Sequence, residues 1–374
     1  MRTPRSATRT VAVVAVPLLL AAVIAGPVAA SAAVATAPVT GPAAPGASFT
    51  TGGQLSGVAA ISATSAWAVG ATPSGKTLIV HWNGTKWTQQ ASPSPSSAKF
   101  GNDLSAVTAT SASNAWAVGY ASTRTSTSTL ILRWNGKNWS RVPSPSGAGS
   151  NTLSGVFAVS DRNAWAVGGG LILHWNGTAW KRVTSPAGGI LHGVTATSAG
   201  NAWAVGTTGK VTHLTTLVEH WNGRAWKRSA SPSPNDLNGD SLRRVAAVSA
   251  RAAWAVGCSF SCASGGLGDG LILRWNGTTW TASRSPQASY FAGVAATSAS
   301  NAWAVGALGT LPVSKTVIAH WNGASWTRVP SPSPPQSGLA DVAAISASDA
   351  WAVGSAGTTH PKTLILRWNG KAWK

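Results

Sequence analysis

The chain has 374 residues, with 28 Lys and Arg against 8 Asp and Glu, which gives a formal net charge of +20. Charged residues make up 10% of the sequence, well below the roughly 25% of an ordinary soluble domain. A hydrophobic fraction of 44% excludes simple disorder, because it supplies enough apolar surface for a core. The single Glu excludes mechanisms that need paired glutamates.

The first 32 residues have the layout of a secretory signal peptide. Three arginines precede an apolar run over 11–24, and Ala30-Ser31-Ala32 is a cleavage site of the A-x-A type. A retained membrane anchor is the alternative, but the run is short for a bilayer and contains Pro17. We therefore expect a secreted protein, extracellular or cell-wall associated, without membrane contact after cleavage. Its mature form keeps 25 basic and 8 acidic residues, a net charge of +17.

Residues 55–374 consist of seven copies of one unit, 38 to 51 residues long. The first copy begins LSGVAAISATSAWAVG and, after a loop, continues TLIVHWNGTKWTQQASPSP. Its three tryptophans, Trp67, Trp82 and Trp87, recur in every copy and so account for all 21 Trp of the chain. The Trp excess is therefore part of the architecture, since indoles bury a large apolar area between packed sheets.

Each copy contains four predicted strands, which in the first copy are 55–61, 66–70, 77–82 and a fourth from residue 85. Asn83-Gly84 recurs in all copies and predicts a two-residue type I′ turn that puts Trp82 opposite Thr85. Seven such copies predict an all-β fold, a seven-bladed β-propeller with four antiparallel strands per blade. A solenoid is the structural rival, but solenoids usually have shorter units and capping repeats.

The seventh copy stops at Lys374, which cuts its fourth strand short. Residues 33–54 carry no charge and are rich in small residues, a composition typical of a flexible arm. Alternatively, the end of this segment, about residues 46–54, completes the seventh blade as a ring-closing strand.

The WAVG stretch, a variable loop, HWNGxxW and a Pro-rich exit together resemble kelch-type repeats and similar arrays in secreted bacterial proteins. The resemblance covers residues 55–374. It departs from kelch repeats in the single Gly after the second strand of most copies and in Trp-Asn-Gly where kelch repeats have Tyr-Asp. It implies a propeller that serves as an interaction platform, with no particular ligand.

The length variation collects in the connections between the second and third strands and between successive copies. These emerge on one face of a propeller, so we expect the binding site on this variable face. The innermost strands begin with small residues after their first Leu or Phe, except at His192, Arg243, Arg244 and Asp341. These four residues predict a ligand site at the channel mouth. The alternative is a set of solvated channel residues, including an Arg–Asp pair.

A basic residue precedes the third-strand Trp in every copy: His81, Arg133, His174, His220, Arg274, His320 and Arg367. Four histidines suggest a metal site, but one per blade would lie too far apart to converge on one ion. We expect these side chains to pack against the indoles instead.

From the basic residue before the third-strand Trp through the fourth strand, the seven copies carry 15 Lys or Arg and no acid. We nominate seven of these cations as a basic belt: Lys137, Arg141, Lys181, Arg182, Lys227, Arg228 and Arg328. Such a belt would attract polyanions. The alternative is that charged outer strands merely block pairing between sheets.

Two cysteines, Cys258 and Cys262, lie in the longest connection between second and third strands. In an exported protein they predict a disulfide. Because it would close a very short loop, it would stiffen that loop and contribute little to global stability.

The sequence predicts an exported, non-enzymatic binding scaffold. Its partner would be an anionic cell-wall or extracellular glycan polymer, or an extracellular protein. The alternative is a glycan-active enzyme, a hydrolase or lyase, with Asp341 at the channel mouth. We expect a monomer, no cofactor, no metal and no nucleic-acid partner.

Overall fold

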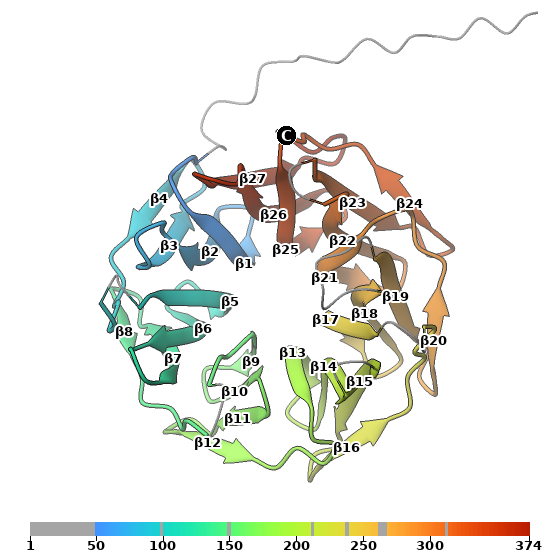
Figure 1. The fold of residues 1–374 in the computed structure, drawn as a ribbon, viewed down its shortest axis with the longest axis horizontal. Helices are drawn as coiled ribbons and strands as arrows, with labels where there is room; N and C mark the ends of the chain where they lie inside the picture. Colours follow the sequence, from blue (N-terminus) through green and yellow to red (C-terminus); the bar gives the residue numbers. More distant parts are fainter. Residues whose placement is uncertain are drawn as a thin grey trace, which may run out of the picture. The chain divides into compact units, whose positions relative to one another are not determined.

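The computed structural model describes residues 49–374 except 98–99, 148–150, 211–212, 236–238, 261–267 and 311–312. The predicted signal peptide and most of the predicted arm lie outside these residues. The described part forms seven antiparallel sheets arranged in a ring (Figure 1), each with its strands in sequence order. It contains no helix, and hence none long and apolar enough to cross a membrane. The prediction of an all-β, seven-bladed propeller is confirmed.

The strands are grouped here by blade, from the inner strand outward. Blades 1 and 2 comprise β1 (Gln54–Ser62), β2 (Ser65–Ala71), β3 (Thr77–Trp82), β4 (Trp87–Gln90), β5 (Asn102–Ser111), β6 (Asn114–Ser122), β7 (Thr127–Trp134) and β8 (Trp139–Arg141). Blades 3 and 4 comprise β9 (Gly155–Ser160), β10 (Asn163–Gly168), β11 (Leu171–Trp175), β12 (Trp180–Val183), β13 (Ile190–Ser198), β14 (Asn201–Lys210), β15 (His213–Trp221) and β16 (Trp226–Ser229). Blades 5 to 7 comprise β17 (Asp240–Ser249), β18 (Ala252–Ser259), β19 (Asp269–Trp275), β20 (Trp280–Ser283), β21 (Tyr290–Ser298), β22 (Asn301–Leu308), β23 (Lys315–Trp321), β24 (Trp326–Val329), β25 (Ser337–Ser346), β26 (Asp349–Ala356) and β27 (Lys362–Trp368).

The glycine of each WAVG stretch is required by close backbone approach. In blade 1 the register between β1 and β2 shifts between Leu55 and Gly57. A Cβ added at Gly70 would overlap the carbonyl oxygen of Gln54 on the neighbouring strand. The equivalent glycines of the other six blades meet the inner strand in the same way. Only Gly fits here, because any side chain would push the inner strand away.

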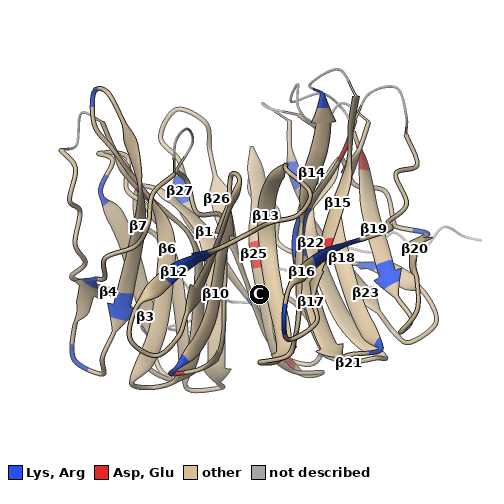
Figure 2. Cartoon of the chain, turned by 90° about the horizontal axis from the view of Figure 1, so that it is seen from below, with Lys and Arg blue, Asp and Glu red and all other residues tan. Residues whose placement is uncertain are grey.

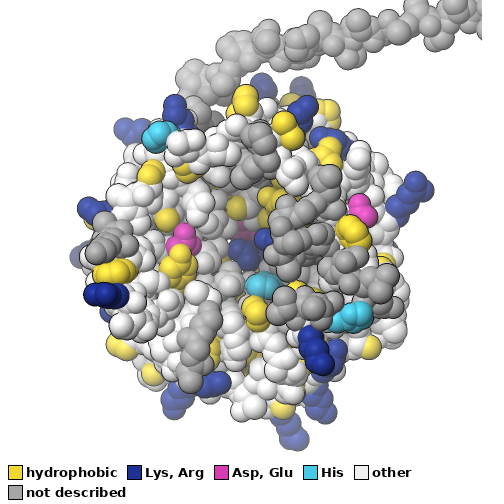
Figure 3. All heavy atoms as spheres, viewed as in Figure 1, with side chains coloured by type: hydrophobic (Ala, Val, Ile, Leu, Met, Phe, Trp, Pro, Cys, Tyr) yellow, Lys and Arg dark blue, Asp and Glu magenta, His cyan; other side chains and the backbone are white. Residues whose placement is uncertain are grey.

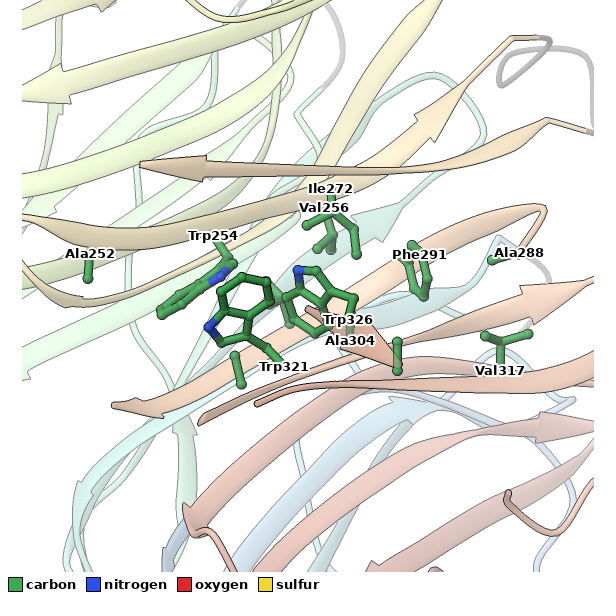
Figure 4. Close-up of a cluster of buried hydrophobic side chains, with 13 residues drawn as sticks. Ala252, Trp254, Val256, Ile272, Ala288, Phe291, Ala304, Val317, Trp321 and Trp326 are labelled. Atoms are coloured by element: carbon green, nitrogen blue, oxygen red, sulfur yellow. The ribbon is translucent and has the colours of Figure 1, made fainter. Parts of the chain in front are cut away.

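The blades are held together by tryptophan triads at their interfaces. Trp67 of β2 is fully buried, and its ring centroid lies 5.0 Å from Trp134 and 5.2 Å from Trp139 of blade 2. Figure 4 shows the equivalent cluster between blades 5 and 6, where Trp254 packs with Trp321 and Trp326. Edge-to-face aromatic pairs of this kind add to the stabilisation from area burial.

The triads also join the last blade to the first. Trp351 of β26 lies 5.1 Å from both Trp82 and Trp87 of blade 1, measured between ring centroids. The ring therefore closes with the same contact that joins the other blades.

The predicted type I′ turn is wrong. Trp82 lies opposite Trp87, not opposite Thr85, so four residues form the connection. The Asn83 side chain closes it, because its Oδ1 accepts hydrogen bonds from the backbone N–H groups of Thr85 and Lys86 at 3.0 Å. Gly84 alone adopts a positive φ, of 95°. The two indoles still share one face of the sheet, as predicted, with centroids 6.0 Å apart.

Residues 49–53 lie along the outer edge of β27, where the fourth strand of blade 7 is short. The Gly53 N–H donates to Pro361 O at 2.8 Å, and the Thr363 N–H donates to Thr51 O at 3.0 Å. The Thr363 hydroxyl also donates to Phe49 O at 3.2 Å. At the other end of β27, Trp373 forms a bridge with Trp368. The edge is thus paired from both ends of the described chain.

The hydrogen bonds of the Thr363 hydroxyl match those of the equivalent threonine in other blades. In blade 1 the buried Thr77 lies within 2.7 Å of the Ser92 hydroxyl and donates to Pro93 O at 3.1 Å. Blades 2, 4 and 6 have the same threonine and the same Ser-Pro partner. In blade 7 the carbonyl oxygens of Phe49 and Thr51 accept from the Thr363 hydroxyl, as the Ser-Pro exit does in these other blades.

Candidate binding site at the channel mouth

One residue from each blade lines a cavity at the variable-face end of the central channel, which we call the channel mouth. The cavity has a volume of about 420 Å³. Its ring of seven consists of Ser56, Ser105, Ser154, His192, Arg243, Ala292 and Ala340, each following the first Leu or Phe of an inner strand. Figure 3 shows this face hollowed near its centre, with basic and His side chains at the hollow. The structure therefore brings His192 and Arg243 together, on adjacent blades.

Arg244 and Asp341 occupy the next position along their inner strands, where the other five blades have Gly or Ala. Arg244 Nε lies 3.9 Å from Asp341 Oδ1. Arg244 Nη2 donates to Ser105 O of blade 2 at 3.0 Å, and Nη1 donates to His192 O of blade 4 at 3.2 Å. Asp341 Oδ2 accepts from the Val58 N–H of blade 1 at 3.1 Å. The pair thus ties five blades together across the channel.

Burial raises the pKa of the Asp341 carboxyl, against the opposing effects of Arg244 and of the Val58 and Val342 N–H groups. Arg244 lines the 420 Å³ cavity on one side and a second cavity of about 270 Å³ on the other, which Asp341 also lines. The pair therefore separates the two ends of the channel. Arg244 and Asp341 thus form the predicted Arg–Asp pair, but Asp341 is buried and lines the 270 Å³ cavity, not the channel mouth where it was expected.

Arg243 makes a different set of contacts. Its guanidinium carbon lies 5.2 Å from the ring centroid of Tyr290, a cation–π contact. Its Nε is buried and has no hydrogen-bond partner. Within the described residues, the ion pairs are Arg244–Asp341 and Arg367–Asp349, so Arg243 has no acid partner.

His192, beside Arg243, is uncharged at neutral pH. Burial lowers its pKa to about 4, with further lowering by Arg243 and Arg244. At the channel mouth, therefore, Arg243 is the cation without a counter-ion among the described residues. The imidazole of His192 can still accept or donate one hydrogen bond.

A larger cavity of about 690 Å³ adjoins the channel mouth and shares Ser56, Arg243, Ala292 and Ala340 with it. It extends over the variable-face ends of blades 5, 6, 7 and 1. Serine, threonine, glutamine and glycine make up most of its lining, with Tyr290 as its one large aromatic side chain among the described residues. Polar hydroxyls and amides thus surround the approach to Arg243.

Sequence reasoning missed two features of this face. Tyr290, which contacts Arg243, directly precedes Phe291, the first large residue of the inner strand in blade 6. Asp103 lies at the start of β5, where burial raises its pKa against hydrogen bonds from Gln54 and Ser105. Burial, and secondarily the charge of Asp103, raise the pKa of Tyr120, which faces Asp103 in the strand register. A polar residue directly before the first Leu of an inner strand is the signal that would have found Asp103.

The seven residues of the basic belt are all exposed. Lys181 and Arg182 lie on β12, and Lys227 and Arg228 lie on β16 of the next blade. Figure 2 shows basic residues on these outer strands and few acidic residues around them. None of the seven forms an ion pair with a described acid. The belt is uneven, because blades 1 and 5 have uncharged residues at the matching positions of β4 and β20.

The repeated histidines pack on indoles, as predicted. The ring centroids of His81 and Trp67 are 4.1 Å apart, and His174, His220 and His320 stack on their own blades' indoles in the same way. Burial lowers the pKa of all four. No three metal-ligating side chains converge within the described residues. Arg133 and Arg367 take the histidine's place over the indole in blades 2 and 7.

The predicted disulfide stays a prediction. Cys258 is buried at the end of β18. Cys262 lies outside the described residues.

Comparison with known proteins identifies the fold and no family. The sequence matches no protein-family model and no curated protein. The structure is similar to YCF48 bound to D1 peptide, with a TM-score of 0.55 and 13% identity over 86% of this chain and 94% of the other. It is similar to a GH74 xyloglucanase from Xanthomonas campestris, with a TM-score of 0.58 and 14% identity over 87% of this chain and 55% of the other. It also resembles a PL25 ulvan lyase bound to -[GlcA(1-4)Rha3S]-, with a TM-score of 0.54 and 8% identity over 83% of this chain and 91% of the other. At these identities the likeness extends to the propeller fold, which peptide-binding and glycan-active proteins share.

Proposed function

We propose that the protein is an exported, non-enzymatic binding scaffold that attaches to anionic polymers of the cell wall or extracellular matrix. The observation that carries the proposal is the basic belt, seven exposed cations without an acid partner among the described residues. A surface of one sign raises the local concentration of a polyanion and speeds its association. Export rests on the signal-peptide pattern of residues 1–32.

The basic belt is densest on two neighbouring blades. Four of its seven members, Lys181, Arg182, Lys227 and Arg228, lie on β12 and β16. Protection of sheet edges would need similar charge on every outer strand, whereas blades 1 and 5 lack it. The uneven distribution therefore favours a binding surface. As part of the same proposal, we take the repeats to be kelch-like. That resemblance implies an interaction platform.

Two other functions expected from the sequence remain separate proposals: binding of an extracellular protein, and enzymatic action on a glycan. An extracellular protein would bind on the variable face, and the peptide bound by YCF48 is compatible with that use of the fold. A glycan-active enzyme would use Asp341. Hydrolysis by the usual route needs two carboxyl groups, and among the described residues that line the three cavities, Asp341 is the one carboxylate. Its contacts with Arg244 and Val58 favour a structural role.

The test is co-sedimentation of the secreted protein with purified bacterial cell walls across a salt series. We expect the protein to pellet with the walls at low salt and to be released as salt rises, because salt screens exposed charges. Walls stripped of their anionic polymers should no longer bind it. Binding that survives both high salt and stripping would contradict the proposal. A soluble sugar that then releases the protein would identify a lectin that uses the variable face.

A further inference from the structure

The channel mouth contains one cation to which the described residues give no counter-ion. Arg244 is held by Asp341 and by the carbonyl oxygens of Ser105 and His192. Arg243, one residue earlier, has a buried Nε without a hydrogen-bond partner and no acid partner among the described residues. A buried N–H donor without a partner is costly. Because Arg243 lines both cavities at the channel mouth, a ligand bound there can supply the counter-ion that the described residues do not.

The surroundings of Arg243 define the charge of a matching ligand. The neighbouring His192 is neutral at pH 7, because burial lowers its pKa to about 4. Arg244 is offset by Asp341. The cavity thus presents a single net positive charge, suited to a singly charged oxyanion. Arg243 offers a planar fork of N–H donors, which fits such a group better than a point charge does.

The surroundings also define the chemical class of the ligand. Ser56, Ser105, Ser154 and Ser241 line the 420 Å³ cavity together with Arg243. The adjoining 690 Å³ cavity is lined mainly by hydroxyl, amide and glycine groups. The described lining also includes apolar side chains, among them Leu55, Tyr290 and Leu339, so capture of a peptide is the competing outcome that the test must exclude. Hydroxyl donors and acceptors around one guanidinium suit a polyhydroxylated chain.

We propose that the channel mouth binds one singly charged oxyanion of a hydroxyl-rich polymer, with Arg243 as its partner. Tyr290 holds the guanidinium in place through the 5.2 Å cation–π contact. The ring serines and His192 bond to the hydroxyl groups that flank the anion. The oxyanion is either the carboxylate of a uronic acid or the phosphodiester of a polyol phosphate. The inference rests on the proposed function, and it adds a defined site to the diffuse attraction by the basic belt.

The test measures binding of short oligomers to the full chain by isothermal titration calorimetry at 0.15 M NaCl, where the belt is largely screened. One pair of probes is tri-galacturonate and its methyl ester. The other pair is a glycerol-phosphate trimer and triglycerol. We expect one acidic probe to bind with 1:1 stoichiometry, and its uncharged counterpart to bind about 10- to 100-fold more weakly, the effect of one charge-assisted hydrogen-bonding group. Which acidic probe binds identifies the source of the oxyanion.

Arg243→Gln should weaken binding of the acidic probe by the same factor. Arg251→Gln removes the same charge from blade 5 at an exposed turn on the opposite face, and should leave binding unchanged. The ester comparison needs no variant, so it stands even if Arg243→Gln folds poorly. Equal binding of the acidic and uncharged probes, no binding of either acid, or Arg243-dependent capture of a peptide instead would each overturn the inference. If the protein does not bind cell walls but still binds the oligomers through Arg243, the proposed function is refuted and the inference stands.

Discussion

Arg244 of blade 5 and Asp341 of blade 7 meet across the central channel, with Nε and Oδ1 3.9 Å apart. They stand where the other blades have Gly or Ala, and their remaining hydrogen bonds reach blades 1, 2 and 4. A seven-fold repeat is thus broken at two positions that compensate one another. The same pairing leaves Arg243 as the channel-mouth cation that has no acid partner among the described residues.

Replacing Asp341 by Ala should destabilise the protein by about 2–3 kcal/mol, since it leaves Arg244 without its carboxylate and the Val58 N–H without an acceptor. Arg244→Ala together with Asp341→Ala should cost about 1–2 kcal/mol less than the two single changes added together. Blade 2, with Ala106 at this position, shows that Ala fits there. Urea unfolding of the four proteins measures the coupling. Strict additivity would show that the two side chains do not interact.

Acidification should destabilise the fold through His192. Because its pKa is about 4 in the folded protein and about 6.5 when unfolded, the unfolded chain binds more protons between these values, so stability falls as pH falls. The loss from pH 7 to pH 5 amounts to about 2 kcal/mol for this residue. His192→Gln should flatten that dependence only in part, because burial also lowers the pKa of the four histidines on the third strands. Urea midpoints at pH 5, 6 and 7 test it, and identical slopes in both proteins would refute it.

The architecture could be predicted because the repeat encodes it seven times. Trp67, Trp82 and Trp87 recur at fixed spacing, and only a closed ring of sheets buries three indoles per unit between neighbours. The hairpin register could not be predicted from Asn83-Gly84 alone. The Asn83 side chain bonds to two backbone N–H groups and stabilises a longer connection than the type I′ turn needs.

The residues of the candidate site could be predicted from the sequence, but the contacts between them could not. His192, Arg243, Arg244 and Asp341 differ from the small residues of the other blades, and that contrast alone nominates them. Which of them meet depends on reach across the ring between blades about 50 to 150 residues apart in sequence. Tyr290 directly precedes Phe291, at the same repeat position as Asp103, but this position differs in every copy, so the contact of Tyr290 with Arg243 emerged only from the structure.

Removal of residues 33–53 should lower the melting temperature. The edge of β27 would lose the hydrogen bonds from Gly53 to Pro361 and between Thr363 and residues 49–51. At about 1 kcal/mol for each of three or four bonds, the expected loss is about 3 kcal/mol. Removal of residues 33–45 alone is the control and should leave the melting temperature unchanged. If both truncated proteins have the same melting temperature as the intact protein, residues 49–53 do not fasten the ring.

The most direct test of the proposed function is a charge-matched comparison of the basic belt. One variant carries Lys181→Gln, Arg182→Gln, Lys227→Gln and Arg228→Gln. Its control removes four exposed cations elsewhere, Lys76→Gln, Arg124→Gln, Arg162→Gln and Arg251→Gln, and has the same net charge. Co-sedimentation with cell walls at low salt should fall sharply for the belt variant and stay near the unmodified level for the control. Equal losses in both proteins would show that net charge alone drives attachment, and would contradict a belt on blades 3 and 4.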